Sequence, residues 1–167
     1  YKNISTNLVK VQSIDATRMN NIKTNSIDII YTDPPYSDII NYSELNLVWD
    51  SWLSFKSNYK NEMVICEETG KSFKNYFVLF EKFLNEASRV LKKDKKLVLI
   101  FNHPRIDHWS ELQKVIINSK FKILDNLEPF RIVSNNKTSS QHKTNKKTQS
   151  FIAIVLENKK KANQIKL

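Results

Sequence analysis

Glycine is almost absent from this sequence of 167 residues. Gly70 is the only one, whereas ordinary usage of about 7% would give roughly a dozen. Loops that cradle phosphates or nucleotides need several glycines close together, because only glycine lets the backbone approach the ligand closely enough. A glycine-rich nucleotide loop is therefore excluded from this stretch of chain.

Cysteine and long apolar runs are also scarce. Cys66 is the only cysteine, so the chain cannot form an internal disulfide, and a lone thiol without Cys or His neighbours is a poor metal site. No run reaches the ~18 apolar residues that a membrane-spanning helix needs, and the chain shows no secretory leader. We therefore expect a cytoplasmic protein with no metal and no membrane partner.

Positive charge is in excess. Lys and Arg number 27 against 17 Asp and Glu, which gives a net charge of +10 and a pI near 9.6. This balance favours a polyanion such as nucleic acid as partner, although a lysine-rich proteome would give the same excess. Residues 134–147 contain no acidic residue and combine hydroxyls and amides with four lysines, a mixture that binds phosphates. The four are Lys137, Lys143, Lys146 and Lys147. An unstructured polar loop is the alternative.

Apolar runs alternate with helix-like segments along the chain. Continuous apolar strands separated by helices are typical of a parallel sheet covered on both faces, so we expect an α/β domain over residues 1–157 and a polar basic tail over residues 158–167. Only a polar loop separates the last two strands, which favours an antiparallel hairpin at the sheet edge. The predicted strands are residues 9–14, 27–32, 97–102, 121–127 and 151–157, and the predicted helices are residues 44–55, 73–91 and 108–118.

Two prolines stand side by side directly after the predicted strand at residues 27–32, in the sequence Asp33-Pro34-Pro35-Tyr36. Prolines end a strand, and each holds the residue before it extended. Ligands of parallel sheets bind beyond the carboxyl ends of strands, which is the kind of position that this stiff loop occupies. Its carboxylate and a proline carbonyl could each accept one N–H of an aromatic amine and direct the nitrogen lone pair outward, while the phenol ring stacks on the base.

The sequence Asp33-Pro34-Pro35-Tyr36 resembles the catalytic signature of the amino-methyltransferases that modify adenine or cytosine in DNA. Residues 14–36 resemble the approach to that signature, and residues 80–103 the helix and strand that follow it. Residues 33–53 are most similar to adenine-specific DNA methylases of the restriction–modification type. The resemblance implies a mostly parallel, Rossmann-like methyltransferase sheet. It also implies methyl transfer from S-adenosylmethionine to the exocyclic amino group of a flipped adenine, less readily cytosine, in DNA.

The resemblance also implies roles for individual residues. Asp33 and the Pro34 carbonyl would bind the amino group, Pro35 completes the motif, and Tyr36 would stack on the base, with capping of the core as the alternative for that ring. Asp15 and the small Ala16 would end the third strand of the fold and contact the cofactor. Asp33 would contact the cofactor as well.

Three aromatic residues follow the motif. Tyr42 is a candidate for holding the flipped base. Trp49 and Trp52 have helical spacing, which favours a core or interface role over base stacking.

Two features depart from the family pattern. The Gly-rich cofactor turn has no counterpart here, and Lys93-Asp94-Lys95 stand where members commonly have Pro-Gly. We expect the chain, which begins at Tyr1, to be a partial domain with strands three to seven of the fold. An upstream segment or a partner chain would supply the first two strands and the cofactor turn. Two alternatives stay open: an RNA guanine amino-methyltransferase, and a catalytically incomplete fragment that binds nucleic acid.

Histidines near the expected cleft give a weaker signal. His103 precedes Pro104 and is interpreted as a turn residue, with substrate contact by Asn102 or His103 as the alternative. Asp107, His108 and Glu111 do not form a convincing metal set, because the helical zinc pattern needs two histidines four residues apart.

Overall fold

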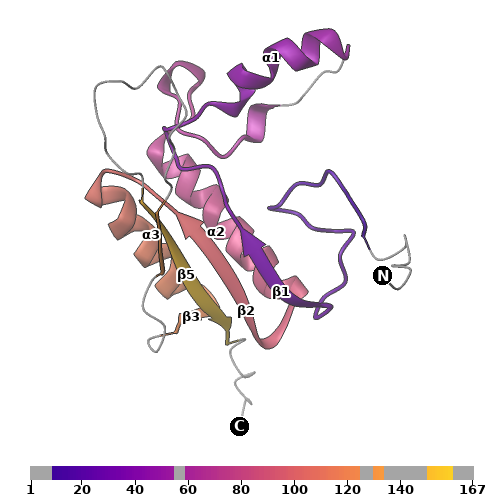
Figure 1. Cartoon of the computed structure of the whole chain (residues 1–167), viewed down its shortest axis with the longest axis vertical. Helices are drawn as coiled ribbons and strands as arrows, with labels where there is room; N and C mark the ends of the chain where they lie inside the picture. Colours follow the sequence, from indigo (N-terminus) through magenta and orange to yellow (C-terminus); the bar gives the residue numbers. More distant parts are fainter. Residues whose placement is uncertain (1–8, 55–58, 125–129, 134–149, 160–167) are drawn as a thin grey trace.

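The computed structural model describes residues 9–54, 59–124, 130–133 and 150–159. The described strands form one five-stranded sheet in the order β1-β2-β5-β3, with β4 also paired to β5 (Figure 1). None of the helices in these ranges has the length and apolar character needed to cross a membrane. The strands are β1 (Ile27–Thr32), β2 (Leu91–Phe101), β3 (Phe121–Ile123), β4 (Phe130–Val133) and β5 (Ser150–Asn158). The helices are α1 (Tyr42–Trp52), α2 (Phe73–Val90) and α3 (Ile106–Asn118), with 3₁₀ turns η2 (Tyr59–Asn61) and η3 (Glu67–Thr69).

Strand directions confirm part of the predicted sheet and correct the rest. β1 and β2 are parallel, and β3 pairs antiparallel with β5 as predicted. The predicted hairpin is wrong in its connection, because β4 lies between these two strands in the sequence and also pairs with β5. β5 also runs antiparallel to β2 and β4, so the prediction of a mostly parallel sheet is wrong for the described strands. The reason is that β5 inserts between β2 and β3, opposite in direction to both of these neighbours.

The strand predicted at residues 9–14 is absent. Val9 and Val11 are 80% and 91% exposed, and no described strand pairs with this segment, so it has no hydrogen-bond ladder to hold it. β1 is consequently an edge strand among the described residues. Ile29 and Tyr31 of β1 are exposed as well, so the prediction of a sheet covered on both faces does not hold for the part of the chain described here.

The core lies between the sheet and two helices. α2 and α3 are on the same side of the sheet (Figure 1), where α2 contacts β2, and α3 contacts both α2 and β3. Apolar residues at helical spacing give α2 its buried face. Phe80, Leu84 and Ala87 of this face are fully buried in one cluster with Leu97 and Leu99 of β2. The core therefore fixes α2 against the strand whose carboxyl end borders the loop at residues 33–38, called the Asp33 loop below.

The junction between α2 and β2 is closed by a buried polar contact. The Nδ2 atom of Asn158 donates to the carbonyl oxygens of Ser88 (3.0 Å) and Leu91 (2.9 Å), and Ser88 Oγ donates to Asn158 Oδ1 (2.8 Å). The turn that follows is made without glycine. The register jumps from Ile27–Leu91 to Ile29–Lys96, so residues 92–95 bulge out, and Asp94 adopts a left-handed φ of 58°, which Asp tolerates better than most residues.

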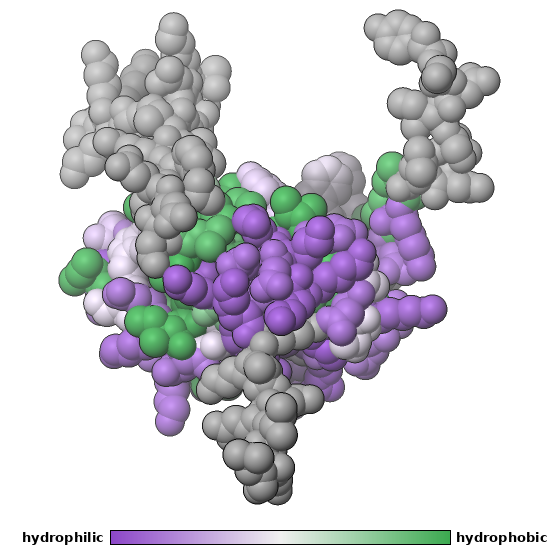
Figure 2. All heavy atoms as spheres, turned by 90° about the horizontal axis from the view of Figure 1, so that it is seen from below, coloured by the Kyte–Doolittle hydropathy of each residue, from purple (hydrophilic) through white to green (hydrophobic). Residues whose placement is uncertain are grey.

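Paired charges cover the end of the sheet where β2 begins. Lys92 and Lys95 lie 3.0 Å and 3.4 Å from Asp28, and Lys159 lies 3.5 Å from Asp94. Figure 2, which shows the molecule from below, has mainly hydrophilic side chains over the middle of this face. Because these lysines already have acidic partners, they are poor candidates for phosphate contacts.

Candidate active site

The Asp33 loop follows β1 at the carboxyl end of the parallel β1–β2 pair. β1 ends at Thr32 and β2 ends at Phe101, and the paired residues Thr32 and Leu99 bring the two ends side by side. Pro34 and Pro35 cannot donate to a ladder, so the strand stops where they begin. The predicted loop thus lies at a sheet position where α/β proteins bind ligands.

Asp33 and Tyr36 are in direct contact. The Tyr36 hydroxyl donates a hydrogen bond to the Asp33 carboxylate, and the Asp33 side chain is exposed. The half-buried Tyr36 ring meets Phe101 edge-on, with centroids 5.7 Å apart, and Phe151 at 5.9 Å. Burial, followed by the hydrogen bond to Asp33, raises the pKa of Tyr36. The phenol therefore stays protonated and holds the carboxylate in one orientation.

The loop is also anchored from α2. The Tyr76 hydroxyl donates to the Pro35 carbonyl oxygen at 2.6 Å. Tyr76 is fully buried, and burial raises its pKa, so it remains a donor at every physiological pH. Because the Pro35 carbonyl already accepts this bond, a ligand amine would have to use the carbonyl of Pro34, a residue that is buried in this structure.

The residues predicted to bind the cofactor lie in an exposed turn. Asp15 and Ala16 are exposed, and the Asp15 carboxylate accepts hydrogen bonds from the Thr17 amide (2.8 Å) and hydroxyl (2.7 Å). An ionised carboxylate has about four lone-pair sites, so Asp15 keeps capacity for a further donor. No hydrogen bond among the described residues joins Asp15 to the Asp33 loop.

The other predicted residues are placed differently. Tyr42 begins α1, is 42% exposed, and contributes to the raised pKa of Tyr36. Trp49 and Trp52 stack edge-to-face 5.9 Å apart but are 59% and 78% exposed, and α1 has no buried residue. The core interpretation of these tryptophans is therefore wrong, because helical spacing does not reveal whether anything covers the face, and the interface interpretation stays a prediction. The four lysines predicted to bind phosphate, Lys137, Lys143, Lys146 and Lys147, lie outside the described residues.

The sequence interpretation missed the role of His103. Its side chain is 1% exposed, and its Nε2 lies 2.8 Å from Asp38 Oδ1. The His103 ring stacks on His108, with centroids 3.5 Å apart and an interplanar angle of 13°. The sequence hint was the pair of histidines on either side of Pro104, but Asp38, the partner of His103, is 65 residues away from it.

Asp38, His103 and His108 also bring three possible metal ligands within 4.8 Å of one another. The lone pairs of an imidazole lie in the plane of its ring. Two stacked, nearly parallel rings therefore keep their lone pairs in two nearly parallel planes 3.5 Å apart, which do not meet at one point between them. In this arrangement, the two histidines cannot both coordinate one ion, and the Arg105 guanidinium, which contacts His108, opposes a cation.

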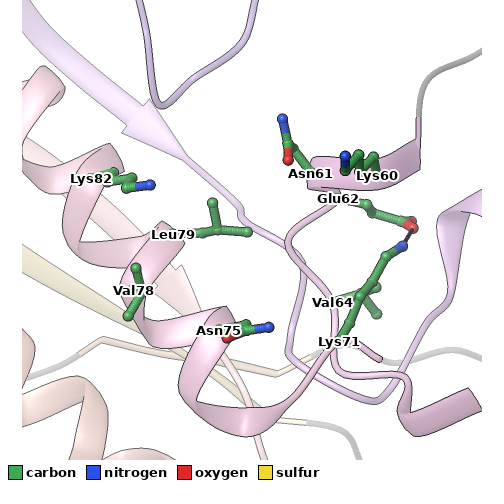
Figure 3. Close-up of a pocket in the computed structure, with 9 residues that line it drawn as sticks. All are labelled: Lys60, Asn61, Glu62, Val64, Lys71, Asn75, Val78, Leu79 and Lys82. Atoms are coloured by element: carbon green, nitrogen blue, oxygen red, sulfur yellow. Dashed lines mark hydrogen bonds and ion pairs between the residues drawn. The ribbon is translucent and has the colours of Figure 1, made fainter. Parts of the chain in front are cut away.

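A separate pocket of about 240 Å³ lies between α2 and residues 60–71 (Figure 3). The Lys71 ammonium lies 2.7 Å from a Glu62 carboxylate oxygen, so these two charges offset each other. No residue of the Asp33–Tyr36 motif lines this pocket. The lining residues are Lys60, Asn61, Glu62, Val64, Lys71, Asn75, Val78, Leu79 and Lys82.

Comparison with known proteins identifies the family. The DNA methylase family model matches residues 27–167, and the chain therefore belongs to the DNA methylases. The matching model is that of the N6/N4 type. None of the curated proteins compared with the chain matches it.

Among the solved structures similar to the chain is a candidate DNA modification methylase from Thermus thermophilus. The two share 14% sequence identity with a TM-score of 0.47, and the alignment covers 86% of this chain and 51% of the other. The chain thus spans about half the length of that protein.

Proposed function

We propose that the protein transfers a methyl group from S-adenosylmethionine to the exocyclic amino group of adenine, or less readily of cytosine, in duplex DNA. The observation that carries this proposal is the joined pair of Asp33 and Tyr36 at the carboxyl end of β1, in a chain of the DNA methylase family. Membership in that family favours DNA over the RNA alternative. The target base would have to leave the stack to reach this loop, at a cost of a few kcal/mol.

Asp33 and the Pro34 carbonyl oxygen would each accept one N–H of the target amine. The nitrogen lone pair, otherwise delocalised into the ring, would then point away from the two acceptors. Preorganised acceptors of this kind stabilise the charge that develops on the nitrogen during attack. Asp33 need not remove a proton beforehand, because the amine becomes acidic only once its lone pair has formed the new N–C bond.

The cofactor, when bound, supplies an electrophilic methyl group. Asp15 fits a role in holding it, because the exposed carboxylate keeps free acceptor capacity beside its two bonds from Thr17. The only glycine, Gly70, ends η3 and cannot form the family's cofactor turn. We propose that an upstream segment or a partner chain contributes that turn.

The test is methylation of duplex DNA by Asp33 variants, with tritiated S-adenosylmethionine and the full protein. Asp33→Ala should lower kcat by about 10²-fold or more, the loss typical of a removed transition-state contact. Asp33→Asn keeps one acceptor oxygen and should lose less. Because Asp33 is exposed, both variants should keep the wild-type circular dichroism spectrum. Activity near the wild-type level in Asp33→Ala would overturn the assignment, and parallel assays on transfer RNA test the RNA alternative.

A second candidate function is DNA binding without catalysis, and the single glycine favours it. Calorimetric titration of the 167-residue chain with S-adenosylmethionine separates the two. Micromolar affinity would argue for a complete cofactor site on this chain, whereas weak binding that improves on adding an upstream segment or partner supports the shared site.

A further inference from the structure

The Asp33 loop contains a conformation that its own sequence does not favour. Ser37 has a left-handed φ of 66°, its side chain is fully buried, and its hydroxyl has no hydrogen-bond partner among the described residues. A non-glycine residue in this region is strained, and a buried hydroxyl without a partner is unfavourable. Contacts with neighbouring elements must therefore hold the loop in this shape.

Three contacts supply that restraint, one from each neighbouring part of the chain. The Ile65 amide donates to the Ser37 carbonyl oxygen at 3.1 Å, Tyr76 donates to Pro35 as described above, and His103 bonds to Asp38. Only the His103 contact comes from the segment after β2. It joins the ends of the two parallel strands that border the site.

Hydrogen bonding fixes the tautomer of His103. The Arg105 amide donates to His103 Nδ1 at 3.2 Å, so in the neutral ring the proton is on Nε2, which donates to the Asp38 carboxylate. Stacking on His108 fixes the ring plane, and the Trp109 indole donates to the His103 carbonyl oxygen at 2.8 Å. The donor that meets Asp38 is thus held from several directions.

Asp38 responds to this contact. Burial raises its pKa, but the hydrogen bond from His103, a hydrogen bond from the backbone of Asp38 itself and the smaller electrostatic effects of His103 and Arg105 outweigh burial and leave the pKa below its ordinary value. The carboxylate is therefore ionised and accepts from His103 throughout the neutral range. Its other oxygen lies 4.0 Å from the Arg105 guanidinium, a weaker and more exposed contact.

We propose that His103 is a positioning residue of the methylase site: by fixing Asp38, it holds the strained Ser37 and keeps Asp33 and Tyr36 in the geometry that grips the target base. This inference rests on the proposed function for its catalytic consequence. Its structural content is independent of that function: the hydrogen bond between Asp38 and His103 joins the segments that follow β1 and β2 and helps to restrain the loop.

Two His103 variants separate the two hydrogen bonds of the ring. His103→Gln places an amide N–H near the former Nε2 and can still donate to Asp38. His103→Asn places an amide oxygen near the former Nδ1, so it keeps the acceptor for the Arg105 amide and loses the contact with Asp38. Arg105→Gln is the matched control, because it removes the nearby charge and leaves the His103–Asp38 bond in place.

The first readout is hydrogen exchange of the amides of residues 33–40, measured by mass spectrometry on the full protein. We expect exchange at least about tenfold faster in His103→Asn and in Asp38→Ala, no further increase in the double variant, and rates within about twofold of wild type in His103→Gln and Arg105→Gln. Unchanged exchange in His103→Asn, or an equal effect of Arg105→Gln, would overturn the proposal.

The second readout is DNA methylation by the same variants. His103→Asn should lower kcat about tenfold with little change in the KM for DNA, and His103→Gln should restore most of it. If the wild-type protein methylates DNA and His103→Asn equals it, the positioning role fails while the proposed function stands. If the wild type shows no methylation, the proposed function fails, and the exchange experiment still decides whether His103 restrains the loop.

Discussion

At the scale of single residues, Tyr36 combines a polar and an apolar contact. Its hydroxyl is bonded to Asp33, and its ring rests on Phe101 and Phe151. The two sequence interpretations of this residue, base stacking and core capping, are therefore compatible. A ring held by core residues has little conformational entropy left to lose when a base stacks on it.

Substitutions of Tyr36 separate the ring from the hydroxyl. Tyr36→Ala should lower kcat/KM by about 10- to 100-fold, because stacking on a base contributes roughly 1–3 kcal/mol. Tyr36→Phe keeps the ring and loses only the restraint on Asp33, so it should cost several-fold at most. Steady-state methylation kinetics measure both. An equal loss in the two variants would mean that the hydroxyl, and not stacking, is what the site needs.

At the scale of secondary-structure elements, the last turn of α2 anchors the segment that precedes β1. Arg89 donates to the carbonyl oxygens of Met19 (2.8 Å) and Ile22 (3.0 Å), and Glu86 accepts from the Met19 amide (3.0 Å). Glu86 and Arg89 also pair with each other at 2.9 Å. This anchor positions the turn that carries Asp15, the candidate cofactor ligand.

The anchor gives stability a defined pH dependence. The hydrogen bond from Arg89 holds the pKa of Glu86 below its ordinary value of 4.5. A carboxylate whose pKa is lower in the folded than in the unfolded protein stabilises the fold. This stabilisation is fully present above the pKa of the unfolded protein and is lost as pH falls through the pKa of the folded protein. Urea unfolding should therefore show Glu86→Gln less stable than wild type at neutral pH, with the difference shrinking below about pH 4.5. A difference that stays constant into acid would contradict this role of the charge.

The helices could be predicted from the sequence because their evidence is local. The prediction of residues 73–91 agrees with α2 at Phe73–Val90, since burial repeats along one helical face. The strand predicted at residues 9–14 failed because alternation of apolar residues does not supply a pairing partner. The exposure of Trp52 and the contact of His103 with Asp38 could not be predicted for the same reason: both depend on what lies nearby in space.

At the scale of the whole molecule, the distribution of positive charge is uneven. Lys92, Lys95 and Lys159 at the end of the sheet opposite the Asp33 loop have acidic partners. The sequence places a second group of lysines, without acids among them, between β4 and β5. Because no acidic residue lies among them in the sequence, the lysines of this second group are better candidates than the first three to release counterions from DNA.

Two triple variants of equal charge test this distribution. Replacing Lys143, Lys146 and Lys147 by Ala should flatten the dependence of DNA affinity on salt, by up to about 0.9 in the log–log slope per lost phosphate contact. Replacing Lys92, Lys95 and Lys159 by Ala removes the same charge and should leave the slope nearly unchanged. Fluorescence anisotropy over a salt series measures both, and equal slopes for the two variants would show that net charge alone governs binding.

The near-absence of glycine has a consequence for which substitutions the chain tolerates. Four residues other than glycine adopt left-handed backbone angles, with φ between 51° and 66°: Asn25, Ser37, Ser54 and Asp94. In most proteins glycine is the usual residue in this conformation. Three of these four positions are on the surface, where nearly any side chain would normally be accepted. In a mutational library they should instead behave like interior sites, with valine, isoleucine and threonine selected against and glycine enriched.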